Sequence, residues 1–160
     1  EQTLALLFAE TERVRCGHRL LADRLFEVLL LQLLRWLLDH PDDAGITEGI
    51  LYGLAHPKLA RALTAVHESP EAAWALEPMA QVAGMSRSAF AAEFKLQVGI
   101  TPAEYLLRWR VSLAQSMLLA GSSIKLASEK LGYASAASFS RAFVQTVGVS
   151  PRVWLQSRQA

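Results

Sequence analysis

The second half of the chain carries two pairs of phenylalanines, each with its members four residues apart and with mostly small or polar residues around them. Phe90 and Phe94 form one pair, and Phe139 and Phe143 form the other. Residues at positions i and i+4 lie on one side of an α-helix, so each pair predicts a helix with a buried aromatic face. The alternating pattern of a β-strand is missing, while Ala, Leu, Arg and Gln are abundant. The pattern predicts an all-α fold.

The two phenylalanine pairs belong to an internal repeat. Gly84 aligns with Gly132 at an offset of 48 residues, and five later positions align at an offset of 49. Those positions pair Phe90 with Phe139, Phe94 with Phe143, Gly99 with Gly148, Pro102 with Pro151, and Tyr105 with Trp154. The extra residue falls in a turn, where an insertion costs little. We therefore expect two copies of one helical unit.

A single helix is predicted to join the two copies. Thr101 can cap this helix, Pro102 suits its first position, and Glu104 lies three residues after Thr101, which together predict a capping box. The helix should continue as far as Gly121. A stiff spacer of this kind fixes the separation of the two units.

Each copy has the pattern of a helix-turn-helix. Gly84 and Gly132 permit the positive φ that a tight turn needs, and Ser86 and Ser135 can cap the helix that follows. With the phenylalanines in the core, the opposite face of that helix points outward. The outward residues are Arg87, Ser88, Ala91, Ala92 and Lys95 in the first copy, and Ala136, Ala137, Ser138, Ser140 and Arg141 in the second. Such short side chains suit close approach to the major groove of DNA.

Charge divides the chain into an acidic and a basic part. Residues 1–55 hold five Arg and Lys against nine Asp and Glu, whereas residues 56–160 hold eleven against six. A basic segment favours a polyanionic partner, although many basic faces are only solvated. We place a domain boundary here, with a helical linker or the end of an effector domain in residues 1–55 and a double helix-turn-helix in residues 56–160.

The richest apolar run lies in the acidic part, from Phe26 to Leu38. It contains Glu27, Gln32 and Arg35 and is too short to span a membrane, so no membrane partner is expected. The run belongs to a predicted leucine-rich helix from Leu20 to Leu38. Its apolar surface is broader than one helix stripe requires. We expect either an intramolecular core or the contact of a homodimer.

Reactive chemistry finds little support in the sequence. Cys16 is the only cysteine, which excludes an intramolecular disulfide and favours a reducing cytoplasm. Cys16 and His18 lack further metal-ligand partners, and Asp42 and Asp43 are an isolated carboxylate pair in a loop. The chain carries neither a phosphate-binding loop nor a nucleophile motif. We expect no enzyme activity, no metal and no cofactor.

The basic segment resembles a known family. The stretches GMSRSAF, GITPAEYL and GYASAASFSRAF, followed by GVSP, are similar to the double helix-turn-helix domain of AraC/XylS-type bacterial transcription regulators. The likeness covers residues 74–158, and a looser one upstream, from Glu10 to Leu38, suggests the end of a cupin-like effector domain. The resemblance implies that an effector ligand, which the sequence does not identify, is bound by a domain outside this chain.

The resemblance also implies how DNA would be bound. The second helix of each unit would enter successive major grooves of double-stranded promoter DNA, about one helical turn or ~34 Å apart. Base-facing residues would be Arg87, Ser88, Ala91, Ala92, Ala136, Ala137, Ser138, Ser140 and Arg141. Contacts to phosphates would come from Lys95, Arg108, Arg110 and Arg152, while Ser86 and Ser135 would contact phosphate or cap their helices. RNA polymerase is the expected protein partner, and activation is the expected outcome. The alternative is a helical protein-interaction module that does not bind DNA.

Overall fold

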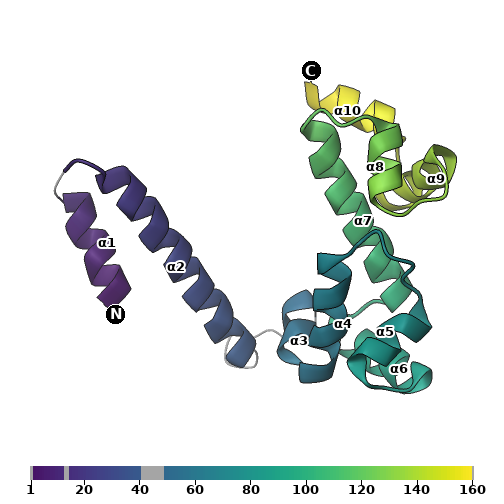
Figure 1. Cartoon of the computed structure of the whole chain (residues 1–160), viewed down its shortest axis with the longest axis horizontal. Coiled ribbons are helices and arrows are strands. Elements are labelled where there is room, and N and C mark those ends of the chain that lie inside the picture. Colours follow the sequence, from purple (N-terminus) through teal and green to yellow (C-terminus); the bar gives the residue numbers. More distant parts are fainter. Residues whose placement is uncertain (1, 13–14, 41–48, 160) are drawn as a thin grey trace. The chain divides into compact units, whose positions relative to one another are not determined.

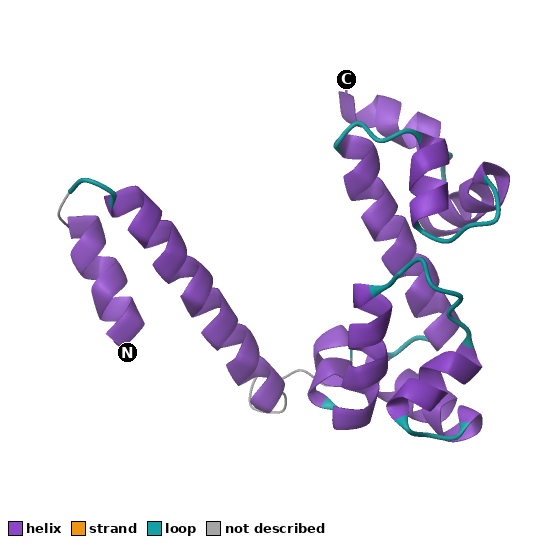
Figure 2. Cartoon of the chain, viewed as in Figure 1, coloured by secondary structure: helices purple, strands orange, loops and turns teal. Residues whose placement is uncertain are grey.

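The computed structural model describes residues 2–12, 15–40 and 49–159. All regular secondary structure in these residues is helical, which confirms the predicted all-α class (Figure 2). The chain divides into two compact units, an N-terminal unit of residues 1–47 and a C-terminal unit of residues 48–160. Asp42 and Asp43 lie outside the described residues.

The sequence predicts a domain boundary between residues 55 and 56, whereas the C-terminal unit of the structure begins at residue 48. Helix α3 (Ile50–Ala55) contacts α4 and α6 of this unit. The contact is close because Gly53 is buried and has no side chain: an added Cβ would lie 2.7 Å from Cγ2 of Val98. Residues separated by more than 40 positions make this contact, so neither composition nor charge reveals it.

The N-terminal unit is a pair of helices, α1 (Gln2–Glu12) and α2 (His18–Asp39), which lie side by side (Figure 1). Neither helix contains a buried residue. Apolar side chains are exposed along both helices; they include Leu4, Leu6, Phe8, Leu20, Leu21, Phe26, Val28, Leu30, Leu31, Leu33, Leu34 and Trp36. The apolar segment predicted from the sequence is therefore a helix whose apolar side chains face outward in this unit.

The C-terminal unit contains eight helices in its described residues. They are α3, α4 (Pro57–Glu68), α5 (Leu76–Ala83), α6 (Arg87–Val98), α7 (Pro102–Leu119), α8 (Ile124–Lys130), α9 (Ala136–Val147) and α10 (Pro151–Gln159). Helices α5 and α6 form the first helix-turn-helix, and α8 and α9 form the second. Helix α7 joins them, as the sequence predicted (Figure 1).

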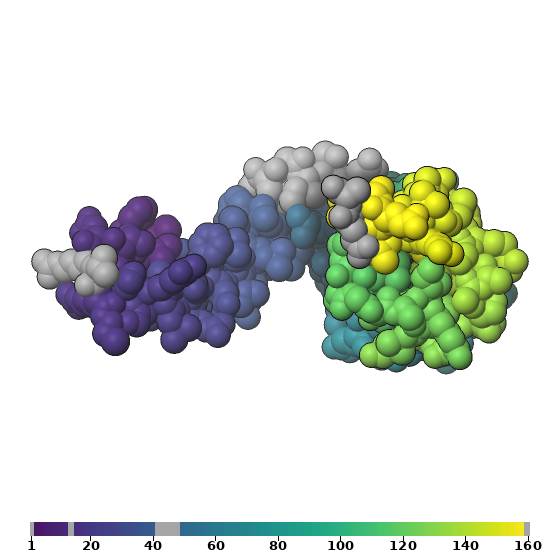
Figure 3. All heavy atoms as spheres, turned by 90° about the horizontal axis from the view of Figure 1, so that it is seen from above, coloured from purple at the N-terminus to yellow at the C-terminus, as the bar shows by residue number. Residues whose placement is uncertain are grey.

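Two hydrophobic cores hold this unit together, and α7 contributes to both. The first core contains Phe90, Phe94 and Leu106 with buried residues of α4 and α5. The second contains Phe139 and Phe143 with Val111, Ala114, Leu118, Leu131 and Trp154. Helix α10 packs against α9 at this end of the chain (Figure 3), where the rings of Phe143 and Trp154 meet edge to face at 5.8 Å. One helix therefore belongs to two cores, each of which fixes one helix-turn-helix.

Candidate nucleic-acid interface

The first helix-turn-helix turns at Gly84. This residue has a φ of 65°, in the left-handed region, and the following N–H of Met85 donates to the carbonyl oxygen of Ala80 at 2.9 Å. This bond satisfies a carbonyl at the end of α5 and reverses the chain within three residues. Ser86 then caps α6, because its hydroxyl oxygen accepts the N–H of Ala89 at 3.3 Å.

The second helix-turn-helix repeats this turn with a more elaborate cap. Gly132 has a φ of 73°, and the N–H of Tyr133 donates to the carbonyl oxygen of Ser128 at 3.0 Å. The hydroxyl of Ser135 accepts the N–H of Ser138 at 3.1 Å, and the hydroxyl of Ser138 accepts the N–H of Ser135 at 3.2 Å. This reciprocal arrangement is a capping box, which places the start of α9 firmly.

The phenylalanine pairs decide which face of α6 and α9 is exposed. Phe90, Phe139 and Phe143 are completely buried, and Phe94 is 1% exposed. The two rings of each pair lie 5.5 and 5.8 Å apart, in the tilted and edge-to-face arrangements that aromatic side chains prefer. The opposite face of each helix points away from its core, and it carries the predicted base-facing residues.

Most of the predicted base-facing residues lie on these outer faces. Those that are exposed are Arg87, Ser88 and Ala92 on α6, and Ala137 and Arg141 on α9. Those that are half-buried are Ala91 on α6, and Ala136, Ser138 and Ser140 on α9. The short residues thus line the helix faces, and Arg87 and Arg141 are the two long cations among them.

The two arginines differ in their surroundings. The Nε of Arg87 lies 3.1 Å from Oε2 of Glu77, and both side chains are 68% exposed. An ion pair that is so open to water stabilises the protein little, so a phosphate or a base can compete for Arg87. Arg141 has no ion pair within the described part of the chain, and the same holds for Lys95 and Arg152. These three exposed cations are open to an anionic partner.

Two of the predicted contacts have a different role in the structure. Arg110 is half-buried, and its guanidinium donates to the carbonyl oxygens of Pro70 at 2.7 Å and Ala72 at 2.8 Å. Two of its nitrogens are therefore bonded to the backbone of the protein itself, and we no longer count Arg110 among the phosphate contacts. The hydroxyl of Ser138 donates to the carbonyl oxygen of Ser135 at 2.7 Å within the cap, so we remove Ser138 from the base contacts.

The capping box predicted at Thr101 forms only by half. The hydroxyl of Thr101 accepts the N–H of Glu104 at 3.3 Å, as expected. The carboxylate of Glu104, however, accepts from the guanidinium of Arg108 one turn further along α7 instead of returning to Thr101. The spacing of four residues places Glu104 and Arg108 next to each other on one face of α7.

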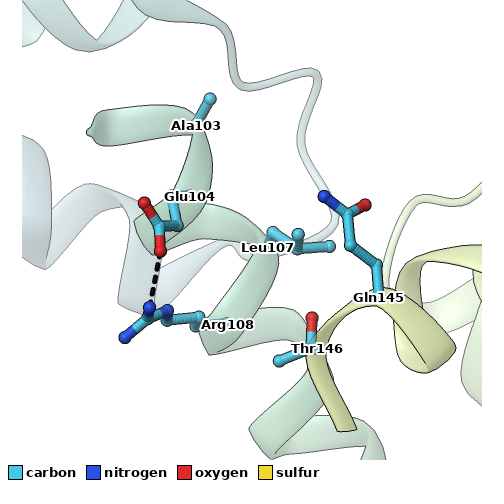
Figure 4. Close-up of a pocket in the computed structure, with 6 residues that line it drawn as sticks. All are labelled: Ala103, Glu104, Leu107, Arg108, Gln145 and Thr146. Carbon is cyan, nitrogen blue, oxygen red and sulfur yellow. Dashed lines mark hydrogen bonds and ion pairs between the residues drawn. The ribbon is translucent and has the colours of Figure 1, made fainter. Parts of the chain in front are cut away.

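Arg108 borders a hollow between α7 and α9, which Figure 4 shows in close-up. The hollow measures about 410 Å³, with Leu107 and Arg108 on one side and Gln145 and Thr146 on the other. The guanidinium of Arg108 points toward Glu104, and 59% of the arginine side chain is exposed. Arg108 therefore stays a candidate for phosphate contact, in competition with Glu104.

Sequence reasoning missed two residues on the outer face of α9. Val144 and Gln145 lie beside Ser140 and Arg141 around a shallow surface hollow, and Val144 is 41% exposed. Helical spacing carries the signal, because positions three and four beyond Arg141 share its face. We add both residues to the candidate interface.

A larger apolar hollow of about 520 Å³ adjoins the outer face of α6. It is lined by Ala91, Ala92 and Lys95 of α6 together with residues of the preceding loop, α5 and α7, among them Trp74, Leu76, Met79, Pro102 and Leu106. The two alanines leave this space open because their side chains end at Cβ. Hydrophobic contact, such as that with thymine methyl groups, suits this surface better than hydrogen bonding.

Comparisons with known proteins agree with this geometry. The family described as a helix-turn-helix domain matches residues 79–157. An AraC-type DNA-binding domain protein from Chromobacterium violaceum has a similar structure, with 26% identity and a TM-score of 0.58 over 64% of this chain and 92% of that one. An AraC-like transcription regulator from Streptomyces antibioticus is 40% identical over 82% of this chain and 43% of its own length. The chain belongs to the AraC family.

Other AraC-family proteins are similar in sequence and structure. The transcriptional regulator AlkR from Acinetobacter baylyi is 35% identical over 92% of this chain and 47% of its own length. The DNA-binding domain of AdpA, solved in complex with a target DNA, has 25% identity and a TM-score of 0.60 over 64% of this chain and 93% of that one. The chain spans less than half the length of the curated relatives named here.

The N-terminal unit has a match of its own. The family described as cupin matches residues 1–39, which contain α1 and α2. This agrees with the expected likeness to the end of a cupin-like domain. Among the described residues no helix is long and apolar enough to cross a membrane, and no group of three or more His, Cys, Asp and Glu side chains could hold a metal ion.

Proposed function

We propose that this chain is the DNA-binding part of a bacterial transcription regulator that acts in the cytoplasm and reads specific double-stranded promoter DNA. The observation that carries the proposal is the repeated presentation of α6 and α9. Each helix is capped by a serine, is anchored through two buried phenylalanines, and exposes its other face. Helix α7 holds the two readers at a fixed separation, as binding to successive major grooves requires.

Contacts with the DNA fall into two classes under this proposal. Arg87, Ser88, Ala91 and Ala92 of α6, and Ala136, Ala137, Ser140 and Arg141 of α9, face the bases, together with Val144 and Gln145. Lys95, Arg108 and Arg152 contact phosphates, which fix the register of the protein but carry no sequence information. The many alanines imply that contacts with methyl groups and the shape of DNA supply much of the specificity.

Selection of bound duplexes from a random library, carried out at two salt concentrations, tests this proposal. An enriched motif with two blocks about one helical turn apart is expected, because α6 and α9 read separate grooves. Affinity should fall steeply with added salt, since each phosphate contact releases counterions. Failure to bind any duplex would overturn the proposal and favour a helical protein-interaction module.

We further propose that the regulator activates transcription by recruiting RNA polymerase. Transcription in vitro from a promoter that carries the selected motif tests this point. A rise in transcript with added protein is expected, and a fall would identify a repressor that blocks the polymerase. The variant Arg141→Ala serves as the control, because weaker DNA binding should reduce either effect.

A homodimer through Leu20 to Leu38 is the third part of the proposal. The apolar side chains that α2 exposes support it, because a helix that is apolar on several sides needs a partner. We expect Leu31→Glu to lower the mass measured by sedimentation to that of one chain. Leu31 is 56% exposed, so the substitution should leave α2 itself intact. A wild-type chain that sediments as a monomer at every concentration would contradict this part.

A further inference from the structure

The loop between α4 and α5 is held in a defined conformation by hydrogen bonds. The N–H of Ala72 and the indole N–H of Trp74 both donate to the carbonyl oxygen of Ser69, at 3.1 and 2.7 Å. The ring of Trp74 packs against the first core. The loop is therefore anchored to the part of the unit that holds the first helix-turn-helix.

The same loop is bound by an arginine of α7. Arg110 donates from two of its nitrogens to Pro70 and Ala72, residues 40 and 38 positions earlier in the chain. Hydrogen bonds from a charged donor are stronger than those between neutral groups. The guanidinium also lies 5.6 Å from the centre of the Tyr133 ring, in the turn of the second helix-turn-helix. Arg110 thus joins the loop to the second helix-turn-helix.

The turn at Gly132 meets the loop directly. A Cβ added to Gly132 would lie 2.1 Å from the carbonyl oxygen of Glu71 and 2.9 Å from its carbonyl carbon. These are backbone atoms, which cannot yield as the end of a side chain can. At Gly84, the matching residue of the first copy, an added Cβ would meet nothing within 4 Å. The absence of a side chain at Gly132 therefore serves a close approach as well as a turn.

We infer that this contact, formed by residues 69–75 with Arg110, Gly132 and Tyr133, is a clamp that sets the spacing of the two recognition helices. Helix α7 fixes their separation along its own axis. The clamp is a second connection between the halves, and two connections prevent the rotation that a single helix leaves open. Arg110 and Gly132 are then positioning residues for DNA reading, a role that rests on the proposed function.

Binding to duplexes of altered spacing tests the clamp. The selected motif is compared with a copy that carries two extra base pairs between its blocks. For the wild-type chain we expect about a 100-fold loss of affinity, because a rigid protein cannot engage both grooves at once. In Arg110→Met this ratio should shrink toward one, while affinity for the selected spacing falls. Arg61→Met, at an exposed position of α4, should keep the wild-type ratio.

A measurement without DNA separates failure of the clamp from failure of the proposed function. Spin labels at Gln81→Cys on α5 and Lys130→Cys on α8, in a Cys16→Ser background, report the distance between the halves. A narrow distribution is expected for the wild-type chain and a broad one for Arg110→Met and Gly132→Ala. A broad distribution in the wild-type chain would overturn the inference, as would an unchanged spacing ratio in a folded Arg110→Met.

Discussion

The two helix-turn-helix units share one local design but have different surroundings. Both turn at a glycine in the left-handed region and both present a helix through two buried phenylalanines. The core of the first is enlarged by α4, whereas that of the second is completed by α10. The glycine of the first turn is open to space, while that of the second lies against a loop. A repeated sequence thus reproduces the turn and the anchor, but not the contacts that each copy makes.

The outer faces of the two units differ as well. Arg87 of α6 forms an ion pair with Glu77, whereas Arg141 of α9 has no ion pair in the described structure. The first unit contacts a histidine, His67, through Tyr105 and Trp109, and all four histidines of the chain precede residue 68. The reading arginine of the second unit is therefore not held by a carboxylate, and we expect the second unit to be less sensitive to pH than the first.

The largest expected effect comes from removing an anchor. Phe139→Ala should lower the free energy of unfolding of the second unit by roughly 3–5 kcal/mol, because it leaves a cavity in the smaller core. Hydrogen exchange resolved by residue should show faster exchange in α8 and α9 and little change in α5 and α6. Val144→Ala on the same helix is the matched control, since Val144 is 41% exposed. An unchanged melting temperature for Phe139→Ala would contradict its place in the core.

Next in size is the loss of a reading arginine. Arg141→Ala should weaken binding to the selected duplex by roughly 1–3 kcal/mol, with a smaller effect on random DNA, if the side chain contacts a base. Arg87→Ala should cost less, because Arg87 must first leave Glu77. Titration of both variants against both duplexes measures the difference. Equal losses on selected and random DNA would assign Arg141 to a phosphate.

Removal of a helix cap should have a smaller effect. Ser135→Ala and Ser86→Ala should each lower the free energy of unfolding by roughly 0.5–2 kcal/mol. Ser135 should lie at the upper end, because its hydroxyl belongs to a reciprocal box with Ser138, whereas that of Ser86 accepts the single N–H of Ala89. Denaturant titration followed by circular dichroism provides the comparison. A larger loss for Ser86→Ala would show that the box adds nothing to the cap.

The smallest effect concerns acid. Burial lowers the pKa of His67 below its ordinary value of 6.5, so the folded protein binds fewer protons than the unfolded chain. The contribution of neutral His67 to the stability of the fold is therefore fully present above pH 6.5. It is lost as the pH drops from 6.5 toward the lowered pKa. After correction for the intrinsic effect of pH, backbone amides of the first helix-turn-helix unit should exchange faster at low pH, and those of the second unit should not. In His67→Gln, whose amide can still bond to Tyr105, this acid-induced increase in exchange should disappear. An increase that persists in the variant would exclude His67 as its source.

Much of the candidate site follows from local sequence. The glycines, the serine caps and the phenylalanine pairs act over one or two turns of helix, so their spacing identifies both reading helices. The residues removed from the candidate site, Arg110 and Ser138, were excluded by hydrogen bonds that only the structure shows. Ser138 lies on the outer side of α9, yet its hydroxyl turns back to the cap. The added residues, Val144 and Gln145, follow Arg141 by three and four positions and so share its face of the helix. The sequence alone could have predicted them.

The sequence by itself determined the helices, their caps, the repeat and the helix that joins its copies, because these depend on residues within a few positions of one another. The tertiary structure decided what each shared feature does. It turned Arg110 toward carbonyl groups 38 and 40 residues away, packed Gly53 against Val98, and laid the loop at Glu71 against Gly132. Contacts between such distant residues depend on how the helices pack, and no local pattern in the chain records them.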